Sequence, residues 1–167
     1  TYGVEAAARH YFASTAANLT VAQAATLAGM VQNPNNYRID RPGGSIFTSD
    51  GTAFNKAPDG VIDEGANLAA LDALVASGEI TEEQKFAAAD GYTSTKVRQL
   101  YVLSRMLDDG KITREQYVEA AVWPISPNIV EPKTGCANAG GAPYFCQYVK
   151  YLILNDAAYG EPAEAPR

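Results

Sequence analysis

The chain has 167 residues, about the length of one domain. Hydrophobic residues make up 47% of it, and acidic residues outnumber basic ones by 19 to 13, which gives a net charge of -6. This balance argues against a surface for nucleic acid or anionic lipid, because such surfaces cluster Lys and Arg. No apolar run approaches the ~18 residues of a membrane span. Many apolar residues are alanine, so we expect a mainly α fold, a small array of closely packed helices.

Two helices are predicted near the N-terminus. Between Val4 and Phe12, apolar residues recur at positions i, i+3, i+4, i+7 and i+8, which is typical of an amphipathic helix. A second helix is expected to begin at Thr20. Thr20 and Gln23 have the spacing of a capping box, in which each side chain binds a backbone N–H at the helix start.

Turn signals dominate residues 41–65. The sequences PGG, DG, PDG and EG follow one another closely there, a composition typical of loops. We therefore expect residues 43–65 to form an irregular excursion that lies outside the helical core and tolerates deletion.

A short internal repeat follows. Residues 78–84 read GEITEEQ, and residues 110–116 read GKITREQ. A glycine after a helix supplies the left-handed conformation that ends it. The Thr and Gln of each copy have the capping-box spacing that starts the next helix. Two copies are too few for a solenoid, so we expect two helical hairpins.

Four stretches of the chain resemble one known family, the class A penicillin-binding proteins. Residues 2–12 (YGVEAAARHYF) and 19–37 (LTVAQAATLAGMVQNPNNY) are similar to YG(I/V)xxAAxxYF and LTxAQAAxLAGxxQxPxxYxP, the last conserved part of the peptidoglycan glycosyltransferase (family 51) domain. Residues 98–113 resemble its RRxxVLxRMxxxGxIT pattern. Residues 142–149 (APYFCQYV) resemble the APYFxxYV stretch that leads into the transpeptidase domain.

The resemblance implies an organisation in four segments. Residues 1–42 would be C-terminal helices and a loop of the glycosyltransferase domain, and residues 43–94 an insertion with a helical hairpin. Residues 95–125 would form the closing hairpin of that domain. Residues 126–167 would form a disulfide-containing linker toward the transpeptidase domain, of the actinobacterial type. The implied fold is the C-terminal lobe of a lysozyme-like glycosyltransferase domain with an irregular insertion.

The resemblance also implies a function for a parent protein. The parent would polymerise lipid-linked disaccharide-peptide and crosslink the product at the extracellular face of the bacterial cytoplasmic membrane. Its other domains and the lipid-linked precursor would be the partners, and the parent would use a divalent metal. The chain has neither an initiator methionine nor a signal segment, so we expect a truncated segment without its anchor. The alternative is a non-catalytic docking module of an extracellular protein.

Catalytic residues of this family are not expected here. Glycosyl transfer needs carboxylates as base and charge stabiliser, and the family carries them in EDxxFxxHxG and ExYLN motifs that do not occur in this sequence. Acylation by penicillin needs an S-x-x-K motif, and no Ser is followed three residues later by Lys. The chain alone is therefore predicted to be inactive and to hold no cofactor.

Three residues are candidates for substrate binding. Glu5 lies inside the opening motif and could support the cleft, but a first-turn Glu is also favoured by the helix dipole alone. Asn35 and Asn36 fall in the loop expected after the second helix. They could contact a sugar or pyrophosphate, or they could simply cap that loop.

The two cysteines are the remaining candidates for a defined chemical role. Cys136 and Cys146 lie on either side of a Gly-containing loop, which is compatible with a disulfide and an oxidising compartment. Actinobacterial members of the family often carry such a pair at this place, and two free buried thiols are the alternative. His10 is the sole histidine, so no ordinary zinc site is expected.

Overall fold

The structure is a computed structural model that describes residues 3–40, 55–131, 136 and 142–155. These residues contain helices and no strand, which confirms the mainly α prediction. The chain divides into two compact units, residues 1–130 and 131–167. None of the helices in the described ranges is both long enough and apolar enough to cross a membrane.

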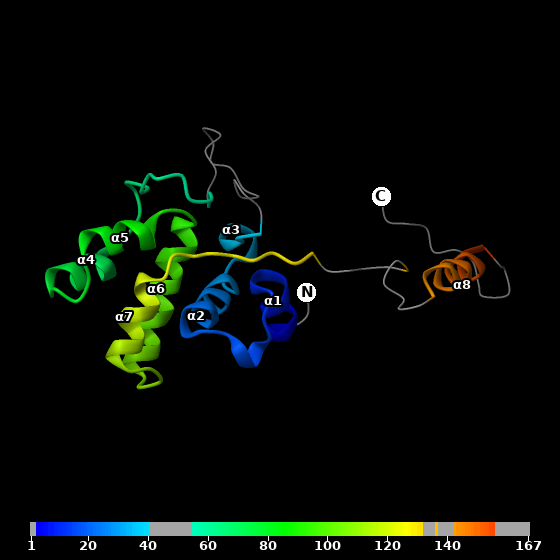
Figure 1. Cartoon of the computed structure of the whole chain (residues 1–167), viewed down its shortest axis with the longest axis horizontal. Coiled ribbons are helices and arrows are strands. Elements are labelled where there is room, and N and C mark those ends of the chain that lie inside the picture. Colours follow the sequence, from blue (N-terminus) through cyan, green and yellow to red (C-terminus); the bar gives the residue numbers. More distant parts are fainter. Residues whose placement is uncertain (1–2, 41–54, 132–135, 137–141, 156–167) are drawn as a thin grey trace. The chain divides into compact units, whose positions relative to one another are not determined.

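Four short helical elements begin the first unit (Figure 1): α1 (Gly3–Phe12), η1 (Ala16–Asn18), α2 (Val21–Met30) and α3 (Pro34–Tyr37). The predicted capping box at the start of α2 is present. The backbone N–H of Gln23 donates to Thr20 Oγ1 at 3.2 Å, and the N–H of Thr20 donates to Gln23 Oε1 at 3.0 Å. These bonds satisfy two N–H groups that a helix start otherwise leaves without partners.

The repeat folds as two helical hairpins, as predicted. Their helices are α4 (Ala69–Ala76), α5 (Glu82–Ala89), α6 (Thr93–Asp108) and α7 (Arg114–Val122). Gly78 and Gly110 follow the first helix of each pair, with φ of +76° and +65°. Both second helices begin with the predicted capping box. A side chain other than glycine would be strained at the two glycine positions.

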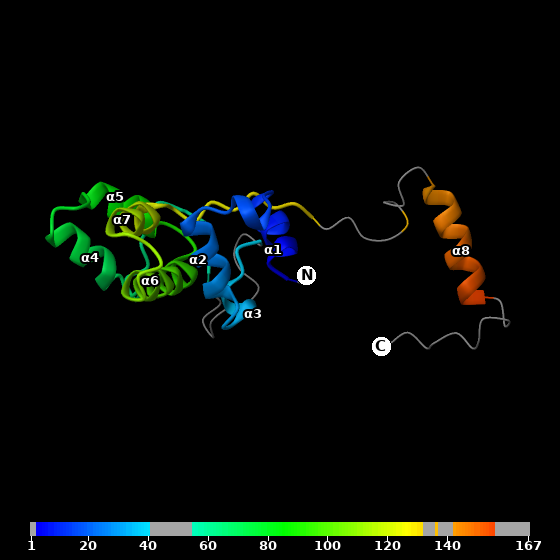
Figure 2. The ribbon, with the colours of Figure 1, turned by 90° about the horizontal axis from the view of Figure 1, so that it is seen from below.

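The main core joins both hairpins to α2. Leu71 of α4, Leu103 of α6 and Ala121 of α7 have no exposed surface and belong to this core together with Ala25 of α2. Figures 1 and 2 show α6 beside both α2 and α7. Alanines on α2, α5 and α7 allow this close approach, which the high alanine content of the sequence predicts.

A second, smaller core lies under α1 and the segment that leaves α7. Phe12 packs edge-on against Trp123, with ring centroids 6.1 Å apart, and Ile125 is buried in the same cluster. The backbone N–H groups of Asn128 and Val130 donate to carbonyls of the last turn of α1. The exit segment therefore satisfies acceptors that the end of α1 would otherwise leave to water.

The prediction that residues 43–65 lie wholly outside the core is wrong for their described part, which begins at Asn55. Asn55 is 2% exposed, and its Nδ2 donates to the Arg38 carbonyl at 2.9 Å and to Thr95 Oγ1 at 2.8 Å. Asp90 Oδ1 accepts from two backbone N–H groups, those of residues 59 and 60, at 3.0 Å each. A buried amide and a carboxylate thus bind this segment to α6 and its approach. The remainder of the predicted excursion, residues 43–54, lies outside the described residues.

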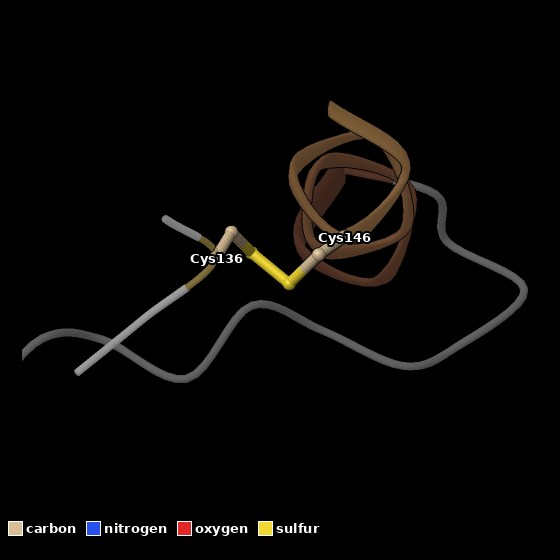
Figure 3. Close-up of a disulfide and its surroundings, with 2 residues drawn as sticks. All are labelled: Cys136 and Cys146. Carbon is tan, nitrogen blue, oxygen red and sulfur yellow. A yellow bond between two sulfur atoms is a disulfide. The ribbon is translucent and has the colours of Figure 1, made fainter. Parts of the chain in front are cut away.

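The second unit contains α8 (Pro143–Asn155) and the predicted disulfide, which joins Cys136 to Cys146 with their Cα atoms 5.2 Å apart (Figure 3). Closing a loop of about ten residues stabilises the folded state by roughly 2.5–3 kcal/mol in the chain-entropy model. Cys146 lies in the first turn of α8, so the bond restrains the start of this helix.

We expect reductant to lower the helix content of the second unit and to leave the melting of residues 1–130 unchanged, because both cysteines lie in residues 131–167. Circular dichroism melts with and without dithiothreitol check this. A Cys136→Ser, Cys146→Ser double variant should match the reduced protein and ignore the reagent. A shift of the main transition on reduction would contradict the prediction.

Candidate functional site

The Glu5 side chain is bound by residues that lie close to it in the sequence. The backbone N–H of Ala16, at the start of η1, donates to Glu5 Oε2 at 2.7 Å, and Arg9 lies 2.7 Å from Oε1. The hydrogen bond from Ala16, with help from Arg9, lowers the pKa of the Glu5 carboxyl. The carboxylate therefore joins α1 to η1, and a contact with substrate stays a prediction.

Asn35 and Asn36 lie in the short helix α3 rather than in the predicted loop. The capping side chain is that of Asn33, whose Oδ1 accepts from the Asn36 N–H at 3.3 Å. Pro34 occupies the first helical position, where its missing N–H costs nothing. Asn35 is exposed and Asn36 is half-buried, so both side chains are placed where a ligand could reach them, and their role stays a prediction.

An apolar groove runs between α1 and α2, next to α3. Its volume is about 560 Å³, and its lining includes Val4 and Tyr11 of α1, Leu27 of α2, Val31 just after α2, and Pro34 at the start of α3. Val4 and Val31 are 59% and 75% exposed. Glu5 and Asn35 do not line this groove, but a neighbour of each does. The groove is built from the residues of the opening motif.

A cluster of polar side chains joins α1 to the segment after α3. Arg38 Nε donates to Asp40 Oδ1 at 2.7 Å, and this hydrogen bond lowers the pKa of the Asp40 carboxyl. His10 Nε2 lies 3.6 Å from Asp40 Oδ2, and His10 Nδ1 is 2.8 Å from the Val130 carbonyl, to which it donates. Sequence analysis missed this cluster, because nothing local relates His10 to residues 30 and 120 positions away. The cluster ties α1 to the segment after α3 and to the exit segment.

A polar group is buried where α2 meets α6. Lys96 and Gln99 have no exposed surface, and Lys96 Nζ donates to Gln99 Oε1 and to the Trp123 carbonyl, both at 2.8 Å. Gln99 Nε2 in turn donates to Thr26 Oγ1 at 2.8 Å. Burial lowers the pKa of the Lys96 amine to about 7. Lys96 and Leu100 are four positions apart, so a helix places them on the same face. This spacing could have indicated the burial of Lys96, but sequence analysis did not use it.

These arrangements do not supply a catalytic acid and base pair. The carboxylates of Glu5 and Asp40 are each bound by an arginine, which favours the charged form and removes the raised pKa expected of a general acid. Within the described ranges, no three His, Cys, Asp or Glu side chains come together as metal ligands would. In these arrangements the side chains of Glu5, Asp40 and Lys96 connect helices and segments of the fold.

Comparison with known proteins identifies the opening motif. Residues 1–49 match the model of the Transglycosylase family. A biosynthetic peptidoglycan transglycosylase of Bdellovibrio bacteriovorus is 39% identical over 74 residues, which is 44% of this chain and 29% of that protein. The protein of the same name from Nitrosomonas europaea is 61% identical over 40 residues, 24% of this chain and 16% of the relative.

This chain matches only part of each relative. The chain spans less than a third of these curated relatives. Penicillin-Binding Protein 1A from Haemophilus influenzae is a structural neighbour at 21% identity and a TM-score of 0.45, with 96% of this chain and 15% of that chain aligned. The match of residues 1–49 shows that the N-terminal segment with the apolar groove is similar to a transglycosylase, and the groove is the candidate site.

Proposed function

We propose that this chain is a segment of a peptidoglycan synthase, in which α1 to α3 complete a glycosyltransferase domain. The observation that carries the proposal is the match of residues 1–49 to the Transglycosylase family, which covers the helices that form the apolar groove. Concave surfaces lined mainly by apolar side chains, as this groove is, are typical of binding sites. The rest of the glycosyltransferase domain would fill it.

The parent would polymerise lipid-linked disaccharide-peptide outside the cytoplasmic membrane, with a divalent metal held by its other residues. Residues 131–167 would lead toward a transpeptidase domain of the actinobacterial type. The disulfide supports an oxidising compartment, because such bonds persist outside the reducing cytosol. The resemblance of residues 142–149 supports the direction toward a transpeptidase.

A docking module is the second candidate, and α8 favours it. Tyr144, Tyr148 and Tyr151 share one helical face and are 86%, 59% and 63% exposed. Aromatic side chains with polar tips are enriched in protein interfaces. Under the first candidate this face would meet another part of the same parent, so the two candidates differ in whether the partner is the same polypeptide.

We expect the isolated chain to form no glycan from lipid-linked disaccharide and no adduct with penicillin. The sequence lacks both family motifs that carry the catalytic carboxylates, and general acid–base help alone is worth about 10²–10⁴-fold in rate. Incubation with labelled lipid-linked substrate and, separately, with a fluorescent penicillin checks this. A glycan ladder or a covalent adduct would show that the chain has a complete site of its own.

The groove is tested in the full-length parent. Ala28 lines the groove on α2 and is exposed, so Ala28→Glu should leave folding intact and place a charge where an apolar segment packs. Misplacement of a catalytic domain by about 1 Å can cost about 10²-fold in rate, so polymerisation should fall steeply. Ala73→Glu, on the exposed face of α4, is the matched control. Equal activity of both variants would refute the role of the groove.

A further inference from the structure

We propose that a polar cavity between residues 63–67 and the start of α6 binds a neutral saccharide. The cavity has a volume of about 380 Å³ and is lined by Tyr37, Asp63, Asn67 and Thr93, among others. This volume falls within the usual range of small-molecule sites. With Ser94, five polar or aromatic residues line it, and they come from three segments: the end of α3, the approach to α4 and the first turn of α6.

The Thr93 hydroxyl is the strongest indication of a ligand. Thr93 is only 5% exposed, yet within the described part of the chain its hydroxyl has no hydrogen-bond partner. Among the described residues, the only fully enclosed side-chain N or O atom without a hydrogen-bond partner is Arg98 Nε. The Thr93 oxygen also lacks a partner but is not in this class, so it is not fully enclosed. It is therefore accessible from the cavity that Thr93 lines. A ligand in the cavity can therefore form a hydrogen bond with this hydroxyl that no described protein group forms.

The two exposed polar side chains are oriented before any ligand binds. Asp63 Oδ1 accepts from the Gly65 N–H at 3.0 Å, which leaves Oδ2 as an acceptor. Asn67 Oδ1 accepts from the Ala69 N–H at 3.3 Å, which leaves the amide NH₂ as a donor. With the Thr93 hydroxyl, which donates and accepts, the cavity presents an acceptor, a donor and a group that is both.

This set of groups suits a saccharide better than an ion. Neighbouring sugar hydroxyls both donate and accept, and a carboxylate beside an amide can bind two of them at once. Among the described residues no Lys, Arg or His lines the cavity, and the Asp63 carboxylate repels anions, which disfavours a phosphate in spite of the nearby helix N-terminus. One carboxylate is far fewer than the 6–8 oxygen ligands of a calcium site. The Tyr37 ring adds an apolar surface for the pyranose ring.

The cavity is distinct from the apolar groove between α1 and α2. The described lining residues of the two are all different, and residues 63–67 lie in the segment predicted from the sequence to be an insertion. The inference therefore goes beyond the proposed function. The chain could bind a glycan here whether or not the groove completes a glycosyltransferase.

The test is a titration of the ¹⁵N-labelled chain with N,N′-diacetylchitobiose, followed by two-dimensional NMR. We expect saturable shifts of the Gly65, Ala66 and Thr93 amides, with a Kd in about the millimolar range. Asp63→Asn should raise the Kd about tenfold, since a hydrogen bond to a charged group is lost. Asp63 is exposed, so this variant should fold normally. Thr93→Val, whose folding is checked by its melting temperature, should weaken binding as well.

Glu64→Gln is the matched control, because it removes the same charge from the adjacent residue, which does not line the cavity. Sodium phosphate and calcium chloride are titrated in parallel. The proposal is overturned if the disaccharide causes no saturable shifts, if Asp63→Asn and Glu64→Gln bind it equally well, or if phosphate or calcium alone shifts these amides. Such failures would leave the polymerisation assay of the parent, and with it the proposed function, unaffected.

Discussion

The stability of residues 1–130 is expected to rise between about pH 7 and pH 10. Replacing Lys96 with methionine is expected to abolish this rise. The pKa of Lys96 is lowered to about 7 in the folded protein, where the amine is fully buried, against 10.5 for an ordinary lysine. Between these values the unfolded chain binds a proton that the folded chain does not. Stability therefore rises with pH through this window.

The same lowered pKa decides how much the buried Lys96 amine destabilises the folded state at low and at high pH. Below pH 7 the amine is charged in both states, and the folded state bears the full cost of a buried charge. Above pH 10.5 it is neutral in both states, and the cost is gone. Between the limits the difference is of order 5 kcal/mol, since each pKa unit corresponds to about 1.4 kcal/mol.

Urea unfolding at a series of pH values measures this effect as the difference between the wild type and Lys96→Met. Methionine leaves the Trp123 carbonyl and Gln99 Oε1 without the Lys donor, a loss of about 1–3 kcal/mol that does not depend on the charge of residue 96. Lys111→Met, on the surface, is the control and should follow the wild type. If Lys96→Met keeps the wild-type slope, the amine remains charged inside the fold.

Deleting residues 43–65 is expected to destroy the cooperative melting of the first unit. The deletion removes Asn55, whose side chain joins the Arg38 carbonyl to Thr95 at the start of α6. It also removes Pro58, which packs so closely on Gly91 that an added Cβ would lie 2.4 Å from the proline nitrogen. Both contacts fix the approach to α6, the helix that the main core surrounds.

Asn55→Ala isolates the hydrogen bonds from the deletion. Loss of a buried amide leaves the Arg38 carbonyl and the Thr95 hydroxyl with fewer partners, and we expect a loss of about 2–4 kcal/mol in the free energy of unfolding. Asn128→Ala, an exposed asparagine of the same unit, is the control and should change stability by less than about 0.5 kcal/mol. A deletion variant that melts like the wild type would restore the view of this segment as a dispensable excursion.

The local signals in the sequence were sufficient for α1, α2 and the two hairpins, but not for the short helix α3 or for α8. The Thr and Gln of three capping boxes, and the glycines at 78 and 110, act through hydrogen bonds and backbone angles within a few residues. Such signals need no knowledge of the rest of the fold. The spacing of Cys136 and Cys146 likewise permitted the disulfide that the structure contains. The opening motif was recognisable because its order and spacing run through two helices.

The buried polar contacts were decided by the tertiary structure. Asn55 and Thr95 are 40 positions apart, and His10 and Val130 are 120 positions apart, so no local pattern relates them. A turn-rich composition correctly indicated an irregular backbone at residues 55–65, yet it could not show that the amide of Asn55 would be buried. Whether a polar side chain enters the core depends on the partners that the fold brings to it, since burial without partners is costly. Lys96 is buried because Gln99 and the Trp123 carbonyl accept its hydrogen bonds, and only the packing of α2, α6 and α7 brings those acceptors within its reach.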